Sequence, residues 1–180
     1  MNLVEQHLPS GTWRADPVFS SVTFSVQHMV IRTFRAGFRD MEATLDGDAG
    51  TLTGSVRVTS MDLNDPELRA RLLSDEFLDA DRHPTVTFVA AELRTGPGRE
   101  LVAPGELTIH GVARRVEAQG RIGLAGPGLG GRDNRLGVEL SATVDRRDFG
   151  LEWQEELPGG GLTLGYDVTL EAILEFVQPL

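Results

Sequence analysis

Apolar and polar residues alternate along several long stretches of the chain, and the longest of these lies near the C-terminus. Every even-numbered residue in it is apolar: Leu162, Leu164, Tyr166, Val168, Leu170, Ala172, Leu174 and Phe176. This period of two predicts a β-strand that is buried on one face. At about 3.3 Å per residue the strand would span about 50 Å, so it must bend, as strands do around a barrel. Gly165 offers a place for the bend.

Similar alternation predicts seven more strands. The strong ones cover residues 136–144, 116–124 and 52–58, the weaker ones cover 38–45, 85–93 and 101–109, and an opening strand runs from Val18 to Gln27. One apolar face per strand favours antiparallel pairing with water on the other side of the sheet. The pattern therefore predicts an all-β protein, either an antiparallel β-barrel or a sandwich, built from about eight strands.

A small helical insertion interrupts the predicted strands. Asp65 is a suitable N-cap, and Pro66 fits the first position of a helix. We expect the insertion at about residues 65–80. It would lie within a single barrel domain, residues 12–177, that follows an N-terminal extension, residues 1–11.

The composition narrows the class of protein further. The net charge is −10, which disfavours nucleic acid and anionic membrane surfaces as partners. The chain has no cysteine, and its basic residues other than histidine are all arginine. Disulfides, thiol chemistry and lysine chemistry are thereby excluded. The sequence shows no signal peptide and no apolar run long enough to be an integral membrane segment, so we expect a soluble, cytoplasmic protein.

One histidine falls on the apolar face of the opening strand. Val22, Phe24 and Val26 alternate with polar residues, and two residues further along the same face is His28. A buried imidazole needs a hydrogen-bond partner or a ligand, because an unpaired polar group in a core costs ~1–3 kcal/mol. Two interpretations stay open: a core histidine satisfied by the protein, or a histidine that contacts a ligand.

The other histidines do not indicate a metal site. No two of the four histidines have H-x-H or H-x-x-x-H spacing, so we expect no metal. His83, before a proline in a polar loop, is expected at the surface, and His110 is expected to point outward or lie at a turn. No nucleophile motif and no pair of acid and base residues stands out.

Two adjacent arginines, Arg146 and Arg147, end one of the long strands. Paired guanidinium groups at a barrel rim suit a phosphate or another polar head group. The alternative is a pair of salt bridges with the neighbouring Asp145 and Asp148. The sequence does not decide between them.

Five motifs in order resemble the YceI-like family of lipocalin-like barrels, across about residues 12–177. They are Trp13 and Asp16 followed by SSVTFSVQHM, then FRAGF (34–38), LLSDEFLDADRHPTVTF (72–88), GELTIHGVARRV (105–116) and DRRDFGL (145–151). The chain departs from the family in lacking a secretion signal and in carrying Arg71 where a histidine is common. The resemblance implies an extended eight-stranded antiparallel barrel whose apolar tunnel holds an isoprenoid lipid, such as a quinone or a polyprenyl phosphate. It also implies a homodimer and no catalytic residues.

We therefore expect a lipid-binding protein rather than an enzyme, with a small amphiphilic lipid as its ligand and no other cofactor. The expected ligand contacts are polar at His28, Arg146 and Arg147 and aromatic at Phe24, Phe38, Phe88, Phe149, Trp153 and Tyr166. Transport, storage and stress-related handling of the lipid are all compatible with such binding. Two alternatives remain: a hydrolase or isomerase with His28 as general base, and a structural or interaction protein whose barrel is filled with side chains.

Overall fold

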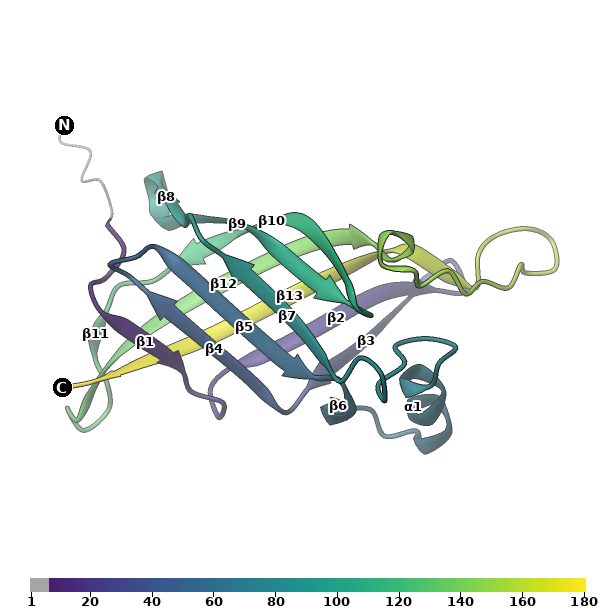
Figure 1. Cartoon of the computed structure of the whole chain (residues 1–180), viewed down its shortest axis with the longest axis horizontal. Coiled ribbons are helices and arrows are strands. Elements are labelled where there is room, and N and C mark those ends of the chain that lie inside the picture. The colour runs from purple at the N-terminus through teal and green to yellow at the C-terminus, as the bar shows by residue number, and fades with distance from the viewer. Residues whose placement is uncertain (1–6) are drawn as a thin grey trace.

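Eight antiparallel strands close into an elongated barrel in the computed structural model, which describes residues 7–180 (Figure 1). In order around the ring they are β12 (Asp133–Asp145), β10 (Val112–Ile122), β9 (Glu100–Ile109), β7 (Thr85–Ala90), β5 (Thr51–Arg57), β4 (Met41–Asp46), β1 (Thr12–Ala15) and β13 (Leu164–Pro179). Pairing of β12 with β13 from Asp133↔Pro179 to Asp145↔Asp167 completes the ring. The predicted all-β barrel with one helix is confirmed.

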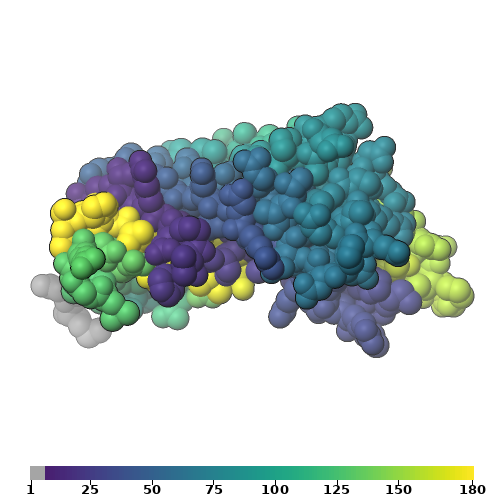
Figure 2. Space-filling model, turned by 90° about the horizontal axis from the view of Figure 1, so that it is seen from below, coloured from purple at the N-terminus to yellow at the C-terminus, as the bar shows by residue number. Residues whose placement is uncertain are grey.

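The remaining strands are attached to this ring. They are β2 (Ser21–His28), β3 (Arg32–Phe38), β6 (Met61–Asp62), β8 (Arg94–Gly96) and β11 (Gly126–Pro127). Strand β2 pairs with the first half of β13, and β3 pairs with β2. The β2–β3 turn protrudes near the end of the barrel opposite the C-terminus (Figures 1 and 2).

Two strand predictions were wrong in detail. The expected opening strand is β2, which branches from β13, whereas the first ring strand is β1, only four residues long. The expected strand at residues 38–45 is interrupted, because β3 ends at Phe38 and β4 begins at Met41. A four-residue strand contains too few alternations to be recognised from its sequence.

The helical insertion contains α1 (Pro66–Leu73), and its N-cap is the predicted one. The Asp65 carboxylate accepts a hydrogen bond from the Leu68 backbone N–H at 3.0 Å. The single-turn 3₁₀ helices are η1 (Val58–Ser60), η2 (Pro97–Arg99) and η3 (Arg146–Phe149). Of these, η3 follows β12 directly and contacts β10, β12 and β13, at the end of the barrel opposite the C-terminus (Figure 1). Most of the expected N-terminal extension, residues 1–6, lies outside the described residues.

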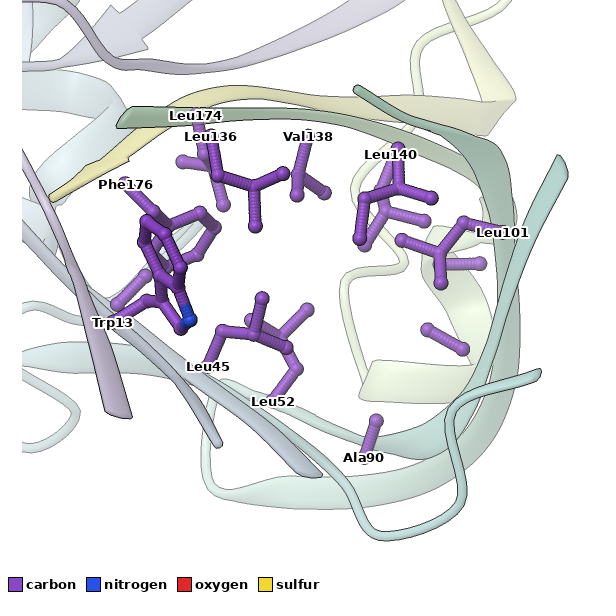
Figure 3. Close-up of a cluster of buried hydrophobic side chains, with 14 of the residues drawn as sticks. Trp13, Leu45, Leu52, Ala90, Leu101, Leu136, Val138, Leu140, Leu174 and Phe176 are labelled. Carbon is purple, nitrogen blue, oxygen red and sulfur yellow. The ribbon is translucent and has the colours of Figure 1, made fainter. Parts of the chain in front are cut away.

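Large apolar side chains fill the barrel end at which β1 and the C-terminus lie. Trp13, Leu45, Leu101, Leu136 and Phe176 are each at most 2% exposed, and they point toward one another across the barrel (Figure 3). The Trp13 Nε1–H donates to the Ser10 carbonyl at 3.2 Å, so this large side chain is buried with its polar atom satisfied. We call the barrel end that these five side chains fill the closed end. A smaller cluster, Leu107, Ile109 and Phe149, lies toward the opposite end, the open end.

Candidate functional site: an apolar cavity inside the barrel

Between the closed end and η3 the barrel encloses a cavity of about 260 Å³. Its lining comes from ten strands (β2, β3, β4, β5, β6, β7, β9, β10, β12 and β13). Three residues of α1 and the loop after it (Leu72, Phe77 and Leu78), η3 and Leu151 complete the wall. None of the five large side chains of the closed end lines it, so the cavity ends short of that cluster. The cavity contradicts the hypothesis of a barrel packed solid with side chains.

Strand alternation places the apolar side chains on the cavity wall. In the β2–β3 hairpin the inward positions pair as Val22↔Phe38, Phe24↔Ala36 and Val26↔Phe34. The Phe24 ring lies 5.8 Å from the Phe38 ring and 6.1 Å from the Phe34 ring, measured between centroids. These spacings are typical of packed aromatic pairs. The hairpin thereby contributes an aromatic wall to the cavity.

Four of the six aromatic residues predicted for the wall line the cavity. They are Phe24, Phe38, Phe88 and Phe149. The other two lie outside the lining. Trp153 packs against Phe77 with ring centroids 5.3 Å apart, while the Tyr166 ring lies beneath the guanidinium groups of Arg146 and Arg147. Sequence reasoning missed Phe34 and Phe77, since the first lies on a strand that was not predicted and the second on an irregular loop.

Arg146 brings a positive charge to the cavity wall. This side chain lines the cavity and is 5% exposed, which makes it one of two buried polar or charged residues in the described chain. It donates three hydrogen bonds to backbone carbonyls: Nε to Gly165 at 2.8 Å, Nη1 to Leu151 at 2.5 Å and Nη2 to Leu164 at 3.1 Å. Burial lowers the pKa of Arg146 from its ordinary value. The guanidinium is thus well hydrogen-bonded but has no carboxylate partner among the ion pairs of residues 7–180.

Arg147, in contrast, is neutralised by its neighbour. Its Nη2 lies 2.6 Å from Asp145 Oδ2, and its guanidinium covers the Tyr166 ring at 3.8 Å from the centroid. The Arg147 guanidinium and backbone N–H hold the pKa of Asp145 at about 2. Arg147 is exposed and does not line the cavity. Of the two interpretations of this arginine pair, the salt bridge describes Arg147 and not Arg146.

His28 does not lie where the sequence pattern predicted. It is the last residue of β2, it is exposed, and it is absent from the cavity wall. The inward alternation ends at Val26, because the register of β2 against β13 shifts between Val168 and Leu164 and the hairpin then leaves the barrel. The expectation of a buried imidazole was wrong, and the general-base hypothesis loses the buried position that it needed.

Comparison with known proteins supports this description. The model of the YceI-like domain matches residues 13–176. The chain belongs to the YceI-like family. Among relatives, a UPF0312 protein of Staphylococcus epidermidis is 26% identical over 167 residues, covering 89% of this chain and 94% of the relative. Protein YceI of Shigella flexneri is 28% identical over 137 residues, or 73% and 70% of the two chains. The family resemblance seen in the sequence is thereby confirmed.

Solved structures agree with the fold of this YceI-like chain. Burkholderia cenocepacia BcnA matches with a TM-score of 0.72 at 18% identity, covering 89% of this chain and 98% of its own. A polyisoprenoid binding domain from Saccharophagus degradans matches with a TM-score of 0.71 at 13% identity, over 95% and 100% of the two chains. Within the described part of this YceI-like chain, no helix is long and apolar enough to cross a membrane.

Proposed function

We propose that this chain binds an amphiphile, with an isoprenoid tail in the barrel cavity and a polar head at the open end. The observation that carries the proposal is an apolar cavity inside the barrel with a single buried charge, Arg146, on its wall. Membership of the YceI-like family, and the fold shared with a domain described as polyisoprenoid-binding, favour a binding protein over an enzyme.

The cavity wall suits a hydrocarbon tail. Burying apolar surface contributes about 25 cal/mol per Å², so a tail needs no directional contact to be held. The volume of about 260 Å³ lies just below the ~300–1,000 Å³ of typical ligand sites. A long isoprenoid would therefore place only part of its tail inside, and its head group would lie toward the open end.

Arg146 is the group that we expect to contact the head. Its guanidinium contacts three carbonyls and lies 5.0 Å from the centroid of the Tyr166 ring, and it has no direct carboxylate partner among the ion pairs of the described residues. A phosphate would supply the missing negative charge, and a quinone carbonyl would accept a hydrogen bond. Because a hydrogen bond to a charged group contributes ~1.5–3 kcal/mol, phosphate should be preferred over an alcohol with the same tail by ~10–150-fold.

Mass spectrometry gives the first test. The protein is purified without detergent, extracted with organic solvent, and the extract is analysed for lipids. A polyisoprenoid in near-stoichiometric amount is the expected result. If the extract is empty and geranylgeranyl phosphate, geranylgeraniol and a quinone with four isoprene units all fail to bind the purified chain, the proposal is wrong.

A matched pair of variants tests the head-group contact. Arg146→Gln should reduce the preference for geranylgeranyl phosphate over geranylgeraniol, whereas Arg147→Gln, beside it but exposed and outside the cavity, should keep it. Equal affinity of the wild-type protein for the two ligands would refute the contact even if Arg146→Gln does not fold. Transport, storage and stress-related handling of the lipid, a homodimer and a cytoplasmic location stay predictions from the sequence.

A further inference from the structure

Three metal-ligating side chains gather at the open end of the barrel, outside the cavity. Asp79, from the loop after α1, His83, four residues later, and His110, from the turn between β9 and β10, place their ligand atoms within 4.8 Å of one another. The two imidazole rings lie edge to face with centroids 4.9 Å apart. Asp79 is 6% exposed and the histidines are half-buried, so this is not a chance encounter of surface side chains.

The turn at His110 orients its ring. His110 and Gly111 form a two-residue hairpin loop, since Ile109 pairs with Val112 and both loop residues have left-handed φ angles of 53° and 72°. His110 Nδ1 lies 3.2 Å from the Phe149 carbonyl oxygen. A carbonyl only accepts hydrogen bonds, so Nδ1 is the donor in this contact and Nε2 is the nitrogen left to bind a metal. An imidazole held by a backbone carbonyl in this way is the usual arrangement of a metal-ligating histidine.

The other two groups are fixed by the loop before β7. His83 packs over the hairpin loop, and a Cβ added at Gly111 would lie 2.6 Å from His83 Cε1. Glycine at this position therefore allows both the left-handed turn and the approach of the ring. The Asp79 carbonyl accepts from the His83 N–H at 2.8 Å, and Asp79 itself has a left-handed φ of 48°. One carboxylate oxygen, Oδ2, lies 2.7 Å from Nε of the exposed Arg82.

We propose that Asp79, His83 and His110 bind a divalent transition metal ion of the Zn²⁺ type. Two imidazole nitrogens and one carboxylate oxygen are a donor set that Zn²⁺ uses in proteins, and three protein ligands leave one position for water or another oxygen. Metal–ligand bonds of ~2.0–2.2 Å place ligand atoms about 3.4 Å apart in a tetrahedron. The three ligand atoms lie within 4.8 Å of one another, so each distance must shorten by at most about 1.5 Å, which rotation of the side chains can supply.

The site shares its supporting segments with the cavity. Leu78, Ile109 and Phe149 line the cavity. Their neighbours Asp79 and His110, and the carbonyl of Phe149 itself, belong to the metal site or support it. Metal binding does not depend on the proposed amphiphile, because Asp79, His83 and His110 are not part of the cavity lining.

Titration of the metal alone tests the proposal. Full-length protein without an affinity tag is treated with EDTA, desalted and titrated with ZnCl₂ by calorimetry, and with CoCl₂ by absorption spectroscopy. We expect one ion per chain and the visible absorption of a four-coordinate cobalt site. Absence of saturable 1:1 binding of either metal would overturn the proposal.

Two variants are chosen to preserve the backbone. Asparagine tolerates left-handed φ angles, and Asn-Gly is a preferred pair in this type of hairpin, so His110→Asn and Asp79→Asn keep the fold. Each should weaken Zn²⁺ binding by at least about tenfold. His7→Ala, which changes an exposed histidine near the other end of the barrel, is the matched control and should bind as wild type. Equal affinity of His110→Asn and wild type would contradict the assignment, and circular dichroism checks that each variant is folded.

Discussion

Filling the cavity from one wall tests whether the isoprenoid tail lies inside the barrel. Gly54 lines the cavity on β5, between its inward neighbours Ala43 and Phe88. A Cβ at this position would be 3.7 Å from the Glu42 carbonyl oxygen and 3.9 Å from the Ala43 Cβ, which are ordinary contacts. Gly54→Leu therefore adds four carbons on the cavity side of β5, the first of them at ordinary contact distances. The fold should be kept, because glycine inside a strand is itself unfavourable by roughly 0.5–1 kcal/mol.

The size of the effect follows from the ligand atoms that the new side chain displaces. If four carbons of the ligand leave the cavity, the binding free energy weakens by about 1.2 kcal/mol at ~0.3 kcal/mol per ligand atom, the value for drug-sized ligands, which we take as the lower limit. At about 0.8 kcal/mol per buried CH₂ the same four carbons cost about 3 kcal/mol, an upper limit. The dissociation constant for a four-unit isoprenoid quinone should thus rise by about 8-fold to 200-fold.

Quenching of tryptophan fluorescence by quinones with one to four isoprene units measures this effect. The loss of affinity in Gly54→Leu should be largest for the longest tail, since a short tail need not reach β5. Thr85→Leu, on the adjacent strand β7, exposed to solvent and outside the cavity lining, is the control and should bind as wild type. Unchanged affinity of a folded Gly54→Leu variant for the four-unit quinone would show that the tail does not occupy the cavity at β5.

Three further outcomes follow from individual contacts. Arg146→Gln leaves buried carbonyls without donors and should lower stability by about 2–4 kcal/mol and the melting temperature by roughly 5–15 °C; a shift under about 2 °C would contradict the hydrogen-bond assignment. Because Arg147 lowers the pKa of Asp145 to about 2 from 3.8, the pair stabilises the fold above about pH 4 and loses this effect as pH falls toward 2. Between pH 4 and pH 2, the free energy of unfolding measured in urea should therefore depend less on pH in Arg147→Gln than in wild type. Asp65→Ala removes the cap on Leu68 N–H and should cost ~0.5–2 kcal/mol in urea unfolding, and no change would mean that the cap is not formed in solution.

The sequence predicted the parts of the fold that rest on long alternating runs. Strands β10, β12 and β13 alternate over 11, 13 and 16 residues, so the period of two stands out and implies a closed antiparallel sheet. Strand β1 offers only four residues, of which Trp13 alone is buried. Its place in the ring depends on pairing with β4 and β13, which are distant in the sequence.

The prediction for His28 shows why alternation cannot place a site residue by itself. Alternation assigns a face to each residue of a strand, but it does not say where the strand leaves the barrel. His28 lies in solvent beyond the shift of register between Val168 and Leu164. This shift occurs in β13, the partner strand, so the pattern of β2 alone does not reveal it. For Phe24 and Phe38, well inside the barrel, the same reasoning was correct about the face.

The surroundings of Arg146 and of the histidines also depend on distant segments. The carbonyls that hold Arg146 come from Leu151, in an irregular segment, and from Leu164 and Gly165, the first residues of β13. Likewise, His83 and His110 approach each other because the loop after α1 packs on the β9–β10 turn. Their spacing in the sequence carries no metal motif, so the sequence alone predicted none.

The two ends of the barrel are built from different kinds of residues, and this division bears on function. The closed end consists of large apolar side chains at most 2% exposed, which stabilise the fold. The open end gathers features that cost free energy. One is a buried guanidinium without a direct carboxylate partner. The others are left-handed φ angles at Met29 and Val30 in the β2–β3 turn, at Asp79 and at His110, four of the five such non-glycine residues among residues 7–180. Strain of this kind, of order 1–3 kcal/mol per residue, persists where the surrounding structure enforces it, and it gathers at binding sites. A fold stabilised at one end can carry such features at the other, and this is why both the head-group contact and the metal site are proposed at the open end.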